Sequence, residues 1–243
     1  HSEKQSMKIL IVLSNPGVGG TETFVLTMAP FLERLGCTVA IYNMWSGSLM
    51  EKQAGAAGLA YDEAPGPGRL LDGAALWRII QKVRRDGIAV VFGFGIRVAM
   101  ALRLLRPVLR GVPVIIGLRG LDLWRRWYHV WPDRLTEFAC DLFVANSRAV
   151  AQQRMAREKT KPSRITVICN GIDVGHFDAS KALAADRQSL GIPLDKIVVT
   201  TVANFRYQKG HEFLLQVISS MVKKHRDVCF VWVGAGSLKE KLQ

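Results

Sequence analysis

A glycine-rich turn at residues 15–20 holds the first groups of the chain that could do chemistry. It follows an unbroken apolar run at residues 9–13 and precedes an amphipathic pattern that begins near Thr21. Glycine lets the backbone turn tightly and approach a ligand, and the start of a helix offers unpaired N–H groups and a positive dipole end. The pattern therefore favours an anion, most often phosphate, near Gly19 and Gly20. A tight turn that binds nothing is an equal alternative.

Two common phosphate-binding motifs do not match this turn. A dinucleotide dehydrogenase would need a third glycine where Glu22 stands, and an acid after the second strand, where the chain has Asn43, Met44 and Trp45. A Walker loop would need Gly-Lys followed by Ser or Thr, which the turn lacks. The sequence therefore disfavours a dehydrogenase and a P-loop ATPase.

The elements that must position these residues follow from the apolar runs. Strands are predicted at residues 9–13, 37–43, 59–61, 88–94, 113–118, 142–145 and 164–168, with helical patterns between most of them. Alternating strands and helices favour an α/β fold with a Rossmann-like, doubly wound parallel sheet of about seven strands. Residues 120–138 are rich in aromatic residues, and their apolar positions repeat neither as in a helix nor as in a strand. We therefore expect an irregular segment there.

The alternation pauses at an Asn-Gly turn signal near residue 170. We expect an N-terminal Rossmann-like domain at residues 7–172, an interdomain passage with one short helix (180–190) at residues 173–196, and the start of a second Rossmann-like domain at residues 197–243. Two predicted strands are too few to enclose a core in that second part. The sequence is therefore expected to be a truncated two-domain protein.

Five short stretches resemble, in the same order along nearly the whole chain, the retaining GT-B glycosyltransferases of the GT4-like, group 1 family. They are residues 19–22, 118–122, 146–147, 169–173 and 202–211. The resemblance implies a GT-B fold with an acceptor domain followed by a nucleotide-sugar domain. It also implies transfer of a hexose from a nucleoside diphosphate sugar to a saccharide or lipid-linked acceptor in cell-surface polysaccharide biosynthesis, with the anomeric configuration retained.

The last stretch is similar to the family's donor-phosphate clamp, in which an arginine and a lysine hold the leaving diphosphate. The lysine matches Lys209, but Asn204 stands at the usual arginine position, so Arg206 is expected to serve instead. Two fixed cations would stabilise the charge that develops on the departing diphosphate. We therefore expect no metal and no cofactor besides the sugar-nucleotide substrate. Gly234 and Gly236 match the family's next glycine turn, which flanks the nucleotide.

The resemblance also places Gly19 and Gly20 near the donor diphosphate, and Glu22 and Arg119 near the acceptor as candidate catalytic residues. The family often has a histidine where this chain has Arg119, so the histidine's role does not carry over. A fixed cation there would meet a phosphate or carboxylate of the acceptor, and a solvated loop arginine is the alternative. Glu22 has a second explanation, because an acid in the first turn of a helix gains from the dipole.

The family's second domain carries two glutamates eight residues apart that bind the donor sugar and ribose. No such pair follows Lys209. We therefore expect the 243-residue chain alone to be weakly active or inactive.

Residues 123–131 hold three of the six tryptophans beside two arginines. Apolar rings with cationic neighbours are typical of a membrane interface, and packing over a cleft edge is the alternative. Aromatics also stack on bases, but no nucleic-acid motif accompanies them, so we expect no nucleic-acid partner. The residues expected to contact a membrane or a lipid-linked acceptor are Asp122, Trp124, Arg125, Arg126, Trp127 and Trp131.

The net charge of +13 is concentrated at residues 97–164, where fourteen Lys and Arg face five Asp and Glu. Such a basic surface indicates an anionic partner. No apolar run reaches the length of a membrane span, and the four cysteines lack metal-ligand spacing. We expect a cytoplasmic protein, peripheral on the inner face of the cytoplasmic membrane. A GT-B-like sugar-nucleotide epimerase and a non-catalytic basic domain that docks on anionic membrane are the alternatives.

Overall fold

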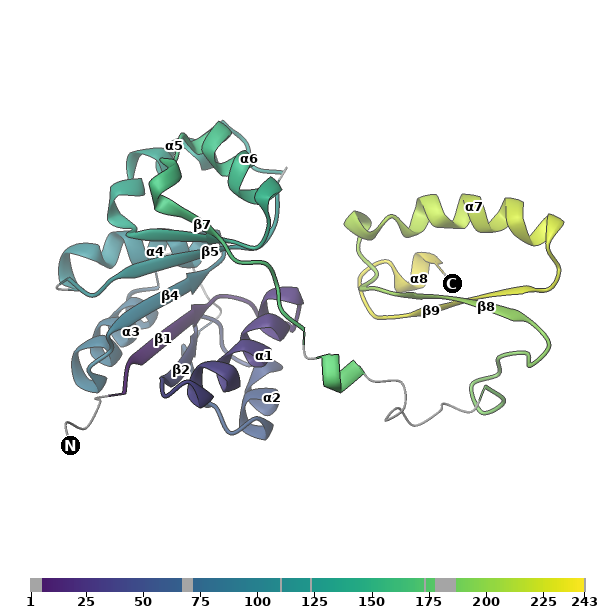
Figure 1. Cartoon of the computed structure of the whole chain (residues 1–243), viewed down its shortest axis with the longest axis horizontal. Coiled ribbons are helices and arrows are strands. Elements are labelled where there is room, and N and C mark those ends of the chain that lie inside the picture. The colour runs from purple at the N-terminus through teal and green to yellow at the C-terminus, as the bar shows by residue number, and fades with distance from the viewer. Residues whose placement is uncertain are drawn as a thin grey trace. The chain divides into compact units, whose positions relative to one another are not determined.

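The chain folds as two compact units, residues 1–172 and 173–243 (Figure 1). The computed structural model describes residues 6–66, 72–109, 111–122, 124–172, 174–177 and 187–242.

Within the described residues, the first unit is built on a parallel sheet of seven strands. The strands are β1 (Lys8–Leu13), β2 (Thr38–Asn43), β3 (Ala60–Glu63), β4 (Val90–Phe94), β5 (Val114–Leu118), β6 (Leu142–Ala145) and β7 (Ile165–Val167). Their order is β3-β2-β1-β4-β5-β6-β7, with every neighbouring pair parallel. This arrangement confirms the predicted doubly wound sheet, and the strand order reverses direction between β1 and β4.

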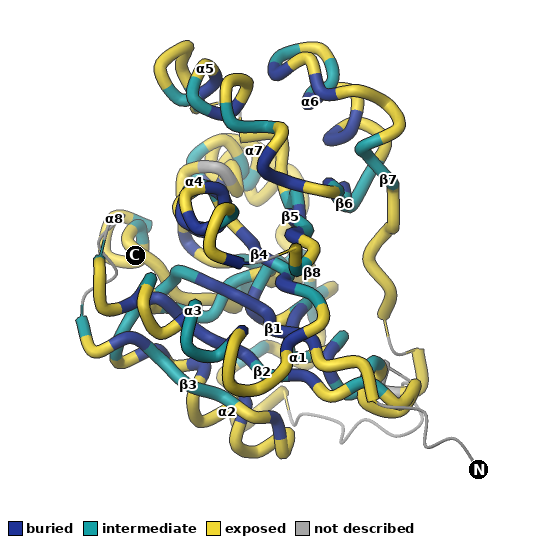
Figure 2. The backbone as a smooth tube through the Cα atoms, turned by 90° about the vertical axis from the view of Figure 1, so that its left-hand side faces the viewer, coloured by how far each residue is buried: buried dark blue, intermediate teal, exposed yellow. Residues whose placement is uncertain are grey.

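Helices cover both faces of this sheet (Figure 1). They are α1 (Gly20–Arg34), α2 (Met50–Ala56), α3 (Gly73–Asp86), α4 (Ile96–Leu105), α5 (Trp127–Leu135) and α6 (Arg148–Glu158). Ile9, Ile11 and Leu13 of β1 pack with α1 and α2, whereas Leu10 and Val12 pack with α3 and α4. Alternate side chains of a strand point to opposite faces, so the unbroken apolar run follows from packing on both sides of the sheet. Figure 2 shows β1 mostly in the colour of buried residues.

The prediction of an irregular segment at residues 120–138 is wrong, because α5 and a 3-10 turn (Glu137–Ala139) lie there. Only Val130 and Asp133 of α5 are buried. A helix whose inward face carries a carboxylate and whose outward face carries tryptophans has no apolar stripe to detect. Pro132 inside the helix weakens the signal further.

The second unit contains a parallel pair of strands, β8 (Ile197–Val202) and β9 (Val228–Val233), joined through α7 (His211–Lys224) and followed by α8 (Lys239–Leu242). The short helix predicted at residues 180–190 lies mostly outside the described residues, and residues 187–191 form turns. Among the helices of the described ranges, none has the length and apolar character needed to cross a membrane.

Candidate functional site

A cavity of about 290 Å³ opens at the carboxyl ends of the strands where the strand order reverses. Its walls come from the first residues of α1 and α4 and from the loop after β5. The lining residues are Thr21, Gly95, Ile96, Ala99, Ile116, Gly117, Leu118, Arg119, Gly120, Asp122 and Arg125. Ligands of open parallel sheets bind outside the carboxyl ends of the strands at such a reversal. The first unit therefore has its candidate site where the topology favours one.

The loop after β1 is held by a buried carboxylate. Glu22 is 3% exposed, and its two oxygens accept hydrogen bonds from the N–H of Gly19 (2.9 Å) and from Nδ2 of Asn15 (3.0 Å). Asn43, at the end of β2, donates through Nδ2 to the carbonyl of Asn15 (2.8 Å) and accepts the N–H of Asn15 (3.2 Å). A Cβ on Gly19 would lie 3.1 Å from Oε2 of Glu22. These contacts fix the start of α1.

These contacts also place three of the candidate residues. Glu22 is not among the lining residues of the cavity, and its carboxylate is used within the loop. The N–H of Gly19 is already donated to Glu22. Gly20 begins α1, where first-turn N–H groups lack acceptors within the helix. Neither Asn15 nor Asn43 was predicted from the sequence as a site residue, although Asn43 at the end of a buried strand was a visible signal.

Arg119 leaves β5 and reaches the cavity wall. Its guanidinium lies 3.6 Å from the ring centroid of Phe24, a residue of α1. No described residue forms an ion pair with it. Partial burial lowers the pKa of Arg119, because removing water disfavours the charged form. Asn146 donates to the backbone carbonyl of Arg119 (3.1 Å) and so holds the loop after β5.

Asp122 bends the loop between this cavity and a smaller one. Its φ is +45°, a left-handed conformation that Asp adopts more readily than most residues. Its carbonyl accepts the N–H of Arg125 (3.0 Å), and its exposed side chain borders both cavities. Non-glycine residues in this left-handed conformation are frequent at binding sites. The conformation of Asp122 therefore supports its choice as a candidate residue.

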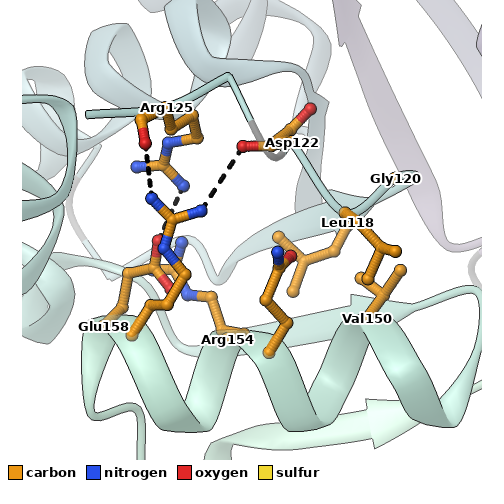
Figure 3. A pocket seen from close by; sticks show the side chains of 10 residues that line it. Leu118, Gly120, Asp122, Arg125, Val150, Arg154 and Glu158 are labelled. Carbon is orange, nitrogen blue, oxygen red and sulfur yellow. Dashed lines mark hydrogen bonds and ion pairs between the residues drawn. The ribbon is translucent and has the colours of Figure 1, made fainter. Parts of the chain in front are cut away.

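The smaller cavity, about 20 Å³, has room for a single water molecule (Figure 3). Arg154 and Glu158 rise from α6 toward Arg125 in this view. Arg125 donates to Glu158 (Nη1–Oε1, 2.9 Å) and to Asp133 of α5 (Nη2–Oδ2, 2.5 Å). The side chain of Arg125 is therefore only 8% exposed and adds little to an exposed surface. Arg125 also lines the larger cavity, and its contact with a lipid-linked acceptor or a membrane stays a prediction.

Asp133 is the centre of this buried network. Besides Arg125, it pairs with Arg103 of α4 and with Arg154 of α6 (Nη1–Oδ2, 3.1 Å). Burial alone would raise the pKa of Asp133, but the guanidinium groups of Arg103, Arg154 and Arg125 outweigh it and hold the pKa below its ordinary value. The network was not predicted from the sequence, because its members lie on separate elements and form no local motif.

The outer face of α5 is a separate exposed surface. Trp127, Trp131 and Leu135, spaced by four residues, are 72%, 51% and 67% exposed. We call this the α5 surface and include in it the neighbouring exposed residues Trp124 and Phe138. Arg126 is exposed beside it, and the guanidinium of Arg134 lies 4.9 Å from the ring centroid of Trp131. An open groove of about 570 Å³ adjoins it, lined by Arg134, Lys159, Lys161, Arg164, Glu137, Glu158 and Phe138.

In the second unit, the loop after β8 and the turn after β9 lie against each other. Arg206 and Lys209 are exposed in the first of these, around a 3-10 turn (Tyr207–Lys209). A Cβ on Gly234 would lie 2.0 Å from the carbonyl oxygen of Ala203, and one on Gly236 would lie 2.4 Å from that of Phe205. Glycine is needed at both positions for this approach. The structure thus brings together the predicted clamp loop and the predicted nucleotide-flanking turn.

His211 is the first residue of α7 and follows this loop directly in the chain. It is 1% exposed, and its ring makes edge contacts with those of Phe205 and Trp232, at centroid distances of 5.1 Å and 5.3 Å. Within the part of the chain that the structure describes, no three His, Cys, Asp or Glu side chains gather as metal ligands would.

The sequence model of Glycosyltransferase Family 4 matches residues 18–176, more than half of the chain. The chain belongs to glycosyltransferase family 4. This match confirms the predicted family and covers the whole cavity at the reversal of the sheet.

Relatives of glycosyltransferase function match parts of the chain. A D-inositol 3-phosphate glycosyltransferase of Corynebacterium kroppenstedtii is 32% identical over 89 residues, or 36% of this chain and 20% of that protein. The putative glycosyltransferase EpsF of Bacillus subtilis is 31% identical over 154 residues, or 57% of this chain and 36% of that protein. The matched part thus spans well under half the length of these curated relatives.

Solved structures share the fold. A glycosyltransferase from Rickettsia africae has a TM-score of 0.77 at 18% identity, covering 97% of this chain and 62% of that chain. Anabaena Alr3699/HepE, solved with UDP and glucose, has a TM-score of 0.75 at 18% identity and covers 97% and 63%. A putative UDP-N-acetylglucosamine 2-epimerase from Listeria monocytogenes has a lower TM-score of 0.63 at 12% identity, covering 94% and 62%. These likenesses show a GT-B-type fold.

Proposed function

We propose that the chain acts in the transfer of a hexose from a nucleoside diphosphate sugar to a saccharide or lipid-linked acceptor, with the anomeric configuration retained. The observation that carries this proposal is the cavity at the reversal of the sheet, because it lies inside the region that matches glycosyltransferase family 4. Its volume is near the lower end for ligand pockets. We assign the acceptor to this cavity.

The donor diphosphate is assigned to the second unit. Arg206 and Lys209 are exposed in the loop after β8. The backbone of this loop lies close to the turn that contains Gly234 and Gly236. Two cations and a glycine turn are therefore present at the same place. Glycosyl transfer leaves negative charge on the departing diphosphate, and fixed cations stabilise that charge as it forms. This chemistry needs no metal ion. The UDP bound in the Anabaena structure supports a uridine nucleotide as the first donor to try.

Glu22 acts in this proposal by positioning the loop, and the backbone N–H of Gly20, in the first turn of α1, is assigned to a phosphate oxygen. The carboxylate of Glu22 is occupied by Gly19 and Asn15, so it shapes the start of α1 instead of taking a proton from the acceptor.

The α5 surface supports a peripheral location on an anionic membrane, where a lipid-linked acceptor for a cell-surface polysaccharide would lie. Exposed tryptophans beside Arg126 and Arg134 match the chemistry of a lipid interface. Membrane docking without catalysis is a second candidate function that this surface favours. It predicts vesicle binding with no requirement for a nucleotide.

The test is release of UDP from a panel of UDP-hexoses, with and without saccharide acceptors, followed by NMR of the product anomer. No two glutamates eight residues apart follow Lys209, so we expect slow turnover by this chain alone. Release of UDP with a new glycosidic bond of unchanged configuration supports the proposal. A C2-epimerised sugar nucleotide would indicate an epimerase, and vesicle binding without any sugar-nucleotide chemistry would indicate a docking domain.

A further inference from the structure

The cavity of the first unit has an unusual charge on its wall. Arg119 lies half-buried on the β5 loop, stacked on Phe24 at 3.6 Å, and no described carboxylate pairs with it. A cation that has lost part of its water and gained no anion is costly unless a ligand supplies the opposite charge. The cation–π contact with the ring of Phe24 favours this position of the guanidinium on the cavity wall.

No described lining group forms an ion pair with Arg119. Arg125 also lines the cavity, but Asp133 and Glu158 hold its guanidinium within the buried network. Asp122 is the acid among the described lining residues, and its exposed side chain forms no ion pair with a described residue. The unpaired cation is therefore Arg119, and an anion bound beside it would be partly shielded from water.

The backbone around the cavity favours the same sign of ligand. Thr21 belongs to the first turn of α1, and Gly95 and Ile96 form the start of α4. Both helices present their positive dipole ends and first-turn N–H groups on this side. These groups add to Arg119 but do not by themselves define a site.

We propose that this cavity binds an oxyanion, a phosphate or carboxylate, carried by the acceptor, and that Arg119 is the side chain that selects it. The inference rests on the proposed function, since it names the class of acceptor for the same site. A neutral sugar would leave the guanidinium unpaired and partly desolvated. An oxyanion would accept hydrogen bonds from the guanidinium and also balance its charge. The phosphate of a soluble sugar phosphate and that of a lipid-linked phosphosugar share this chemistry.

Calorimetric titration of the chain tests the proposal with four probes: glucose 1-phosphate, glucuronate, neutral methyl glucoside and a short-chain glucosyl phosphoprenol. We expect at least one oxyanion to bind about tenfold or more tightly than methyl glucoside, as a charge-assisted hydrogen bond would give. Similar binding of the two phosphate probes supports a soluble acceptor. Tighter binding of the phosphoprenol supports a lipid-linked one.

Variants of Arg119 assign the effect to the side chain. Arg119→Gln should abolish the preference for the oxyanion, and Arg119→Lys should keep part of it. Arg34→Gln is the matched control, because Arg34 also lies over a phenylalanine, Phe31 at 4.1 Å, at the opposite end of α1. Circular dichroism of each variant confirms folding. Equal binding of methyl glucoside and the oxyanions, an unchanged preference in Arg119→Gln, or no binding of any probe would overturn the inference.

Binding of UDP, measured in parallel, separates this inference from the proposed function. Transfer of a hexose to an uncharged acceptor, with no oxyanion preference, would remove the inference and leave the transferase standing. Oxyanion binding through Arg119, with no binding or turnover of a sugar nucleotide, would support the oxyanion site and argue against the proposed transferase function.

Discussion

Nη2 of Arg125 lies 2.5 Å from Oδ2 of Asp133, and this contact joins the loop that lines the cavity to the helix that carries the exposed tryptophans. Asp133 and Val130 form the buried side of α5, while Trp127 and Trp131 point outward. The position of the α5 surface and the shape of the cavity wall thus depend on one carboxylate.

The first prediction concerns the stability that this carboxylate provides. Asp133→Asn leaves three guanidinium groups without their shared anion, so we expect a loss of about 3–5 kcal/mol in the free energy of unfolding. Urea denaturation measures it. Asp62→Asn is the control, because Asp62 forms its ion pairs with Arg78 and Lys82 at the surface and should cost less than about 1 kcal/mol. Equal losses in the two variants would refute the central role of Asp133.

The second prediction is the pH dependence of the same effect. The pKa of Asp133 in the folded chain lies below its ordinary value of 3.8, so the stabilisation is fully present above that value and is lost as pH falls through the folded pKa. The difference in unfolding free energy between wild type and Asp133→Asn should be constant from neutral pH to about pH 5 and shrink only below pH 3.8. Urea denaturation across this range checks it. A difference that already shrinks above pH 5 would contradict the lowered pKa.

The third prediction concerns Glu22. Glu22→Ala leaves the N–H of Gly19 and the amide of Asn15 without their acceptor, so we expect a loss of about 1–3 kcal/mol in unfolding free energy. Glu33→Ala, an exposed change on the same helix, should alter stability by less than about 0.5 kcal/mol. If Glu22→Ala keeps full stability but loses all transfer activity, Glu22 acts on the substrate and not on the loop.

The fourth prediction concerns the α5 surface. The tryptophans at positions 127 and 131 each keep roughly half or more of their area exposed, and inserting it into a lipid interface is worth roughly 2 kcal/mol per ring. Replacing both with alanine should weaken binding to phosphatidylglycerol vesicles more than about tenfold in a co-sedimentation assay. Trp77→Ala, a change of a 55% exposed tryptophan on α3, is the control and should leave binding unchanged. Equal effects of the two changes would point to nonspecific adhesion.

The sequence predicted secondary structure correctly where the buried side chains are apolar, as they are in β1. The run through β1 predicted a strand covered on both faces, because its alternate side chains enter two separate cores. The sequence failed at α5, where the inward face is held by charges: Asp133 meets arginines from α4, α6 and the β5 loop, and no local pattern announces such a contact. The same contact places Arg125 in the interior, although its neighbours Trp124 and Arg126 are exposed.

In the candidate site, too, some features were predicted from the sequence and others were not. Arg119 and Asp122 were predicted because residues 118–122 resemble a motif of the family, and both line the cavity. The engagement of Glu22 with Gly19 and Asn15 depends on the fold of the turn, which glycine positions alone do not specify. The contact between the loop of Phe205 and the turn of Gly236 required the pairing of β8 with β9.

Binding of a sugar nucleotide through the second unit tests the proposed transferase most directly. Isothermal titration of UDP and of UDP-hexoses into wild type, the Arg206→Ala/Lys209→Ala double variant and the control Lys224→Ala measures it. We predict saturable binding to wild type and to the control, where the lysine lies exposed in the last turn of α7. Loss of two charge-assisted contacts should weaken binding roughly a hundredfold or more in the double variant. No binding of any nucleotide to wild type, or equal affinity in all three proteins, would contradict the proposed donor site.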